Sequence, residues 1–170
     1  MSVRTWLFVI LMLLSAAAYA ELKPFSIPEG MVAMYPSEPV FQERLESEYG
    51  FVRTYMAHTD DLMMFVATYA HEPISTNANG RIAVRNYVQE LAGGMAGELI
   101  SSKATAVDGM PAREFVVQSM MEGYRANTYG IVFFDQGDYY QWSVTEVEGI
   151  TQASAADIVR AHIGRVRLED

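Results

Sequence analysis

Three histidines, His58, His71 and His162, are the side chains in this sequence that ordinarily change charge near neutral pH. His58 is followed closely by Asp60 and Asp61, and an imidazole nitrogen with two carboxylates is a ligand set that suits a divalent metal ion. We therefore take His58, Asp60 and Asp61 as a candidate metal site. Aspartates in a tight turn also accept hydrogen bonds from nearby backbone groups, so a turn-building role for the same two aspartates remains open.

A second candidate is the alternating aromatic and polar segment at 139–145. In a strand, Tyr140 and Trp142 point to one face, and Tyr139 and Gln141 point to the other. The first pair is typical of a core. An uncovered second row would be an aromatic, hydrogen-bonding surface suited to a protein partner or a sugar; under a covering helix the same row would be buried. Both interpretations are open, and Tyr139 and Gln141 are our candidate partner- or ligand-binding residues.

The motifs of several enzyme classes are missing. The sequence has no cysteine, no G-x-S-x-G of the kind that carries a nucleophilic serine, and no glycine-rich phosphate loop. Its 21 acidic residues offer many carboxylate pairs, none of which is singled out for glycoside hydrolysis. We therefore expect no enzymatic activity and no cofactor, with a bound divalent metal ion as the alternative.

Residues 1–20 have the three parts of a secretory signal. Arg4 precedes an apolar run over 6–14, and an Ala-x-Ala sequence at 18–20 precedes Glu21. The run is shorter than the roughly 20 apolar residues that cross a membrane, so we expect cleavage before Glu21 and no stable membrane anchor afterwards. Such a chain is typical of the bacterial periplasm, with secretion as a variant.

The charge excludes one class of partner. Without residues 1–20, which contain Arg4 and no acidic residue, the chain keeps 11 basic and 21 acidic residues, a formal charge of −10. Binding to a nucleic acid depends largely on neutralising phosphates with lysine and arginine, so we expect no nucleic acid partner.

The elements that must position these residues follow from the sequence pattern. Two strand-like runs, 49–57 and 62–70, flank the turn of the candidate metal site and predict a hairpin. The charged segment 40–48 before them predicts an edge strand. Apolar residues with helical spacing predict a helix over 77–93.

Residues 98–148 predict a four-stranded antiparallel meander. Asp108-Gly109 is a strong hairpin signal between its first two strands. Ser154 has the position of a helix cap for a short last helix, and 165–168 are expected to close the sheet. The pattern predicts one α+β domain over 21–170, an antiparallel β-sheet flanked by helices.

Two segments carry a resemblance to a known family. The opening Phe25-Ser-Ile-Pro-Glu-Gly and the Gly109-Met-Pro-Ala-Arg-Glu-Phe115 that begins the meander, together with the order of elements, resemble the PsbP-like fold superfamily. That group includes the PsbP subunit of photosystem II and bacterial periplasmic DcrB-like proteins. The sequence departs from the family in having Met31 where many relatives have tryptophan, and in lacking the lipid-attachment cysteine of anchored members.

The resemblance implies an α/β/α sandwich that serves as a non-catalytic accessory or binding module. It also draws attention to Arg113, for which a structural ion pair and a ligand-anchoring role are both open. Our leading hypothesis is a non-enzymatic periplasmic binding or accessory protein that acts through protein–protein contacts. The alternative is a protein that binds a divalent metal ion or another small ligand through His58, Asp60 and Asp61.

Overall fold

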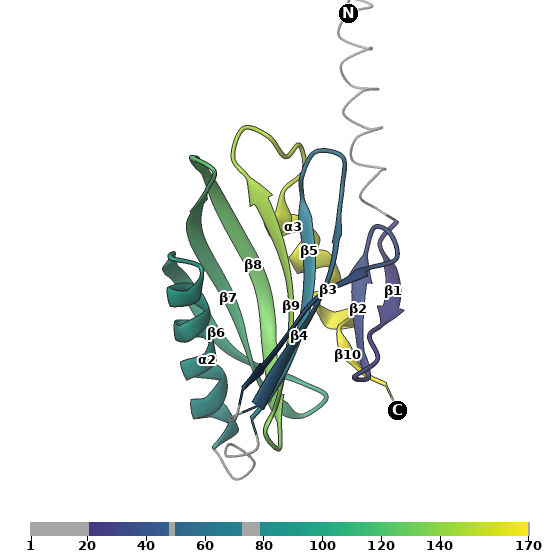
Figure 1. The fold of residues 1–170 in the computed structure, drawn as a ribbon, viewed down its shortest axis with the longest axis vertical. Helices are drawn as coiled ribbons and strands as arrows, with labels where there is room; N and C mark the ends of the chain where they lie inside the picture. The colour runs from purple at the N-terminus through teal and green to yellow at the C-terminus, as the bar shows by residue number, and fades with distance from the viewer. Residues whose placement is uncertain (1–20, 48–49, 73–78, 170) are drawn as a thin grey trace, which may run out of the picture.

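A seven-stranded antiparallel sheet forms the centre of the molecule (Figure 1). The structure is a computed structural model that describes residues 21–47, 50–72 and 79–169, so the predicted signal peptide lies outside the described residues. The strands of this large sheet lie in the order β3 (Val40–Ser47), β4 (Gly50–His58), β5 (Met64–His71), β9 (Asp138–Val147), β8 (Tyr124–Asp135), β7 (Met110–Met121) and β6 (Glu98–Val107).

Different layers cover the two faces of the large sheet. Helix α2 (Gly80–Gly94) lies against one face, mainly over β6, β7 and β8. The other face is covered by helix α3 (Ala155–His162) and by a small sheet in the order β1 (Lys23–Ser26), β2 (Met31–Tyr35) and β10 (Arg167–Leu168) (Figure 1). A short 3-10 turn, η2 (Ile163–Arg165), connects α3 to β10. The predicted α+β class, with an antiparallel sheet flanked by helices, is confirmed.

Local turn chemistry explains the meander. Each of its three hairpins closes with a non-glycine residue followed by glycine, and both residues have positive φ: Asp108-Gly109, Glu122-Gly123 and Gln136-Gly137. Two consecutive residues with positive φ match the right-handed twist of the flanking strands, and glycine adopts this conformation without a steric penalty. The four predicted strands are therefore present within 98–148.

The hairpin of β4 and β5 joins the meander through β9, which the sequence pattern did not indicate. Strand β5 pairs with β9 along its whole length, from Met64 opposite Thr145 to His71 opposite Asp138. This pairing places β9 between β5 and β8 in the interior of the sheet. Layers cover the sheet on both sides at this strand, so nearly all side chains of β9 are buried.

The side chains of β9 alternate between two cores. Trp142 and Val144 belong to the cluster under the small sheet and α3, whereas Tyr139 belongs to the cluster under α2. Trp142 is fully buried, and its indole Nε1 donates a hydrogen bond to the backbone oxygen of Met34 in β2 at 3.0 Å. This bond connects the large sheet to the small one.

The ends of the helices agree with the sequence signals. The Asn79 side chain accepts a hydrogen bond from the backbone N–H of Arg81 at 3.1 Å, and Ser154 caps α3 through the N–H of Asp157 at 3.3 Å. The C-terminal strand differs from expectation, because β10 pairs with β2 of the small sheet and not with the large sheet. Within the described parts of the chain, no helix is long and apolar enough to cross a membrane.

The Trp142 bond leads to a stability prediction. Changing Trp142 to Phe removes the indole N–H, leaves the Met34 oxygen without its partner and opens a small cavity, so we expect the free energy of unfolding to fall by about 2–3 kcal/mol. Urea unfolding followed by circular dichroism measures the change. Met120→Ala is the matched control, since this side chain is 67% exposed. Equal losses in the two variants would contradict the role assigned to Trp142.

A second prediction concerns the end of α3. Burial, and then the charge of Arg165, lower the pKa of His162 from its ordinary value of 6.5. The unfolded chain therefore takes up the proton more readily, and this part of the stability is lost as pH falls below about 6.5. His162→Gln should show a smaller fall in Tm than the unchanged chain between about pH 7.5 and about pH 5. Arg165→Gln should give an intermediate fall, and identical profiles for all three proteins would exclude this effect.

Candidate functional site

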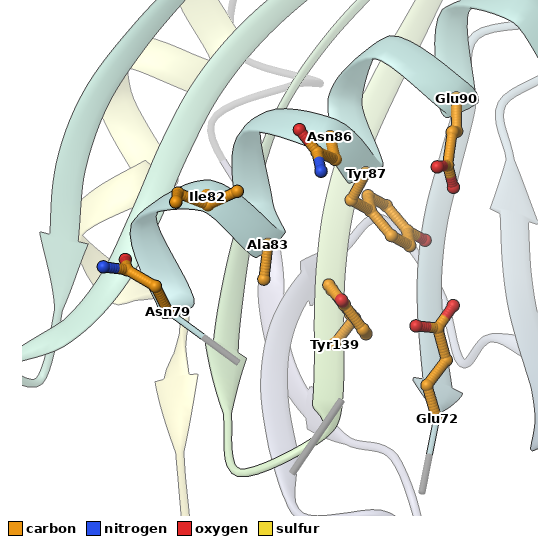
Figure 2. A pocket seen from close by; sticks show the side chains of 8 residues that line it. All are labelled: Glu72, Asn79, Ile82, Ala83, Asn86, Tyr87, Glu90 and Tyr139. Carbon is orange, nitrogen blue, oxygen red and sulfur yellow. The ribbon is translucent and has the colours of Figure 1, made fainter. Parts of the chain in front are cut away.

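Helix α2 has a hollow on each side, and the two hollows carry opposite charges. The first has a volume of about 270 Å³, and we call it the tyrosine hollow (Figure 2). Residues from α2 form one wall, while Tyr139 of β9 and Glu72 after β5 lie opposite (Figure 2). Its lining residues are Glu72, Asn79, Ile82, Ala83, Asn86, Tyr87, Glu90 and Tyr139.

Two of the predicted binding residues, Tyr139 and Gln141, both contact Tyr87, which lines this hollow. The ring of Tyr87 stacks on that of Tyr139 with 5.0 Å between the ring centres and 17° between the planes. The hydroxyl of Tyr87 donates a hydrogen bond to Oε1 of Gln141 at 3.2 Å. Tyr139 and Gln141 are each only 5% exposed, so helix α2 covers this row of side chains, as in the second of the two interpretations left open by the sequence. Of the two residues, only Tyr139 lines the hollow.

The surroundings of Tyr87 in the tyrosine hollow keep its phenol protonated. Burial first, and then the carboxylate of Glu72, Tyr139 and the carboxylate of Glu90, raise the pKa of Tyr87 above its ordinary value of 10.0. The phenol therefore stays protonated at neutral pH and acts as a hydrogen-bond donor. A general base needs a pKa near the working pH, which this tyrosine does not have.

The second hollow lies between α2 and strands β6 and β7, and its volume is about 510 Å³. We call it the arginine groove, and its lining residues are Arg81, Ile82, Val84, Arg85, Ala104, Thr105, Ala112 and Arg113. Arg81 and Arg85 are four residues apart on α2, which places them one above the other on the helix. Arg113 approaches from β7. The groove thus has three guanidinium groups and, among the described residues that line it, no carboxylate.

Arg113, the third predicted binding residue, has no ion-pair partner in the described parts of the chain. Its Nε is buried there without a hydrogen-bond partner. Most buried polar groups in proteins are paired, so this donor is an exception within the described residues. Planar guanidinium groups match carboxylates and phosphates, which makes the groove suited to an anion.

A glycine allows α2 to begin close to β7. A Cβ atom on Gly80 would lie 2.7 Å from Cγ of Pro111 and 3.0 Å from Cδ1 of Phe134, closer than real Cβ contacts allow. Only glycine permits this approach without a shift of the neighbours. Arg81 directly follows Gly80, and Arg113 lies two residues after Pro111, so this contact lies next to the arginine groove.

One residue of the predicted metal site, Asp61, forms hydrogen bonds within the protein. Asp61 accepts hydrogen bonds from the hydroxyl of Thr59 and, at 2.8 Å, from the backbone N–H of Gln152. Its carboxylate therefore holds the β4–β5 turn against the segment before α3, which fits the turn-building interpretation. His58 and Asp60 are exposed. In residues 21–47, 50–72 and 79–169, no three His, Cys, Asp or Glu side chains are grouped to hold a metal ion, so the metal site stays a prediction.

A histidine–aspartate pair lies at the opposite end of the same hairpin. Nδ1 of His71 is 2.6 Å from Oδ1 of Asp138, and the hydroxyl of Tyr69 donates to the same oxygen at 3.0 Å. These side-chain contacts link the paired ends of β5 and β9.

The sequence reasoning missed Arg81, Arg85 and Tyr87. The helical pattern located α2 correctly, but it did not indicate which strand each side of the helix would face. The spacing of Arg81 and Arg85 was a usable signal, since residues four apart share one side of a helix. That spacing alone did not indicate that Arg113 of β7 lies across the groove from them.

Comparison with protein-family models and with curated proteins found no match to this sequence. Several solved structures are similar in fold. One is a Pseudomonas aeruginosa protein of unknown function, with 10% identity over 85% of this chain and 90% of that chain, at a TM-score of 0.43. Another is the PsbP protein of the cyanobacterium Synechocystis, with 12% identity, coverage of 84% and 86%, and a TM-score of 0.43.

A third similar structure is LpqN of Mycobacterium tuberculosis, described as involved in cell envelope biogenesis. It has 12% identity, coverage of 88% of this chain and 91% of that chain, and a TM-score of 0.42. The PsbP-like fold that the sequence resemblance implied is therefore found among the similar structures. What a chain does with such a fold depends on its own side chains.

The unpartnered Nε of Arg113 leads to a prediction about the free protein. Changing Arg113 to Met keeps most of the side-chain volume and removes a desolvated donor, so we expect the free energy of unfolding to rise by about 1 kcal/mol. Arg81→Met is the control, because Arg81 is exposed and should give no such gain. Urea unfolding measures both variants. A loss of stability in Arg113→Met would mean that this arginine supports the fold itself.

Proposed function

We propose that this chain is a non-catalytic binding protein of the bacterial periplasm that acts by contacting another protein. The predicted signal sequence supports the location, and the tyrosine hollow and arginine groove support binding over proton-transfer chemistry. The proposed contact is the addition of an extended segment of the partner to the free edge of β6.

The difference between the two edges of the large sheet carries this proposal. Edge strands expose unpaired backbone groups, and proteins protect them with charged side chains. Strand β3 contains Glu43, Arg44 and Glu46, whereas β6, after its first residue Glu98, contains only the charge of Lys103. Within the described residues no strand pairs with the outer side of β6, and most of its ten residues are exposed. By sequence, β3 therefore carries more of the charges that typically protect an edge strand than β6 does.

An available edge next to a groove is a known arrangement for peptide recognition. Backbone hydrogen bonds to the edge supply affinity, and the adjoining surface supplies selectivity. Ala104 and Thr105 of β6 line the arginine groove, so a segment paired with β6 would lie beside α2. Ile82 of α2 borders both hollows and is 48% exposed, which adds an apolar contact at the same place.

Site-specific cross-linking tests the proposal. A photo-reactive phenylalanine analogue replaces Ser101 on β6 or, as the control, Gln42 on β3; both positions are exposed. We expect a discrete cross-linked protein from position 101 in intact cells and none from position 42. A charge placed on the edge by Ala106→Lys should remove the product from position 101, while Gln42→Lys should not. Equal cross-linking from both edges, or none from β6, would contradict the proposed contact.

A further inference from the structure

The arginine groove specifies the chemistry of the bound segment. Resting on the proposed contact at β6, we infer that the partner segment is acidic and carries carboxylates at alternate positions, which bind Arg81, Arg85 and Arg113.

The unpaired state of these arginines is the first observation. Acidic residues outnumber basic ones by 21 to 12 in this chain, so carboxylates are not scarce. Other arginines use them: Arg53 lies 2.5 Å from Glu29, and Arg160 lies 2.7 Å from Asp157. Arg81, Arg85 and Arg113, in contrast, form no ion pair within the described residues. Three cations gathered in one groove repel one another, and an anion bound between them removes that repulsion.

The position of Arg113 is the second observation. Its buried Nε has lost water and has gained no protein acceptor. An ionised acceptor offers this donor a charge-assisted bond, which is stronger than a bond to a neutral oxygen.

The spacing of the arginines is the third observation, and it favours an extended peptide over a compact anion. Four residues of α-helix rise about 6 Å, which separates Arg81 from Arg85 along α2. Alternate residues on one face of a strand are separated by about 6.6 Å. Figure 1 shows α2 running beside the β6 and β7 side of the sheet. A strand added to β6 therefore presents carboxylates at i and i+2 with nearly the same spacing as the two helical arginines.

The acidic surface elsewhere sharpens this selectivity. The negative charge repels acidic chains that approach any other part of the molecule, and salt screens that repulsion beyond about 10 Å. Only a segment whose carboxylates reach the arginine groove gains an electrostatic attraction that offsets this repulsion. Binding is thus most strongly disfavoured for acidic proteins whose carboxylates do not match the spacing of the arginines.

Peptide titrations followed by NMR test the inference with the purified chain. The probes are (Thr-Glu)4, its neutral counterpart (Thr-Gln)4, and an eight-residue peptide with the same number of glutamates placed in one block. We expect (Thr-Glu)4 to bind at least tenfold more tightly than either other peptide, with chemical shift changes in β6 and α2. Arg85→Gln and Arg113→Gln should each weaken binding of (Thr-Glu)4 at least tenfold. Arg125→Gln is the control, because Arg125 lies at the distant β7–β8 turn beside Glu148, and it should leave binding unchanged.

The other outcomes overturn the inference in distinguishable ways. Equal binding of the glutamate and glutamine peptides, or binding indifferent to Arg113→Gln, would show that the segment is not selected by its charge. Inorganic phosphate that displaces (Thr-Glu)4 at equal concentration would identify a small-anion site in place of a peptide site. If cross-linking from position 101 persists in the arginine variants, the inference fails and the proposed contact stands; if that cross-linking is absent from the unchanged chain, the proposed contact itself fails.

Discussion

The pairing of β5 with β9 is the constraint on which the other features depend. It brings the β4–β5 hairpin and the meander into one sheet and makes β9 an interior strand with two buried faces. One face of β9 then holds Trp142 beneath the small sheet, and the other holds Tyr139 and Gln141 beneath α2. Without this pairing, the β4–β5 hairpin and the meander would each expose an unpaired strand edge and apolar side chains that are now buried.

The two faces of the sheet are used differently. The face under the small sheet contains the larger, mainly apolar core, and the Trp142–Met34 bond fixes its geometry. The face under α2 is only partly filled, because a single helix covers a wide sheet and leaves a hollow on each side. The firmly packed face under the small sheet therefore supports the face under α2, where charged side chains line the two hollows. A binding site requires rigid support of this kind.

Sequence reasoning succeeded where the determining physics is local. Turns such as Asp108-Gly109, the cap at Ser154 and the apolar spacing in α2 depend on residues within a few positions of one another. It failed where distant segments meet. The β5–β9 pairing, the joining of β10 to β2, and the approach of Arg113 to Arg81 join parts of the chain that lie 28 or more residues apart. Periodicity identifies a buried face but does not identify its neighbour. The candidate site was thus named in fragments, with Arg113 and Tyr139 recognised but their companions on α2 missed.

The arrangement of the small sheet has a consequence for how the chain acquires its structure. Its central strand, β2, is fully buried, and one of its two partners is β10 at the opposite end of the described chain. The small sheet is therefore incomplete until the C-terminal residues are available, so an emerging chain cannot finish this layer early. Contacts between such distant segments also slow folding.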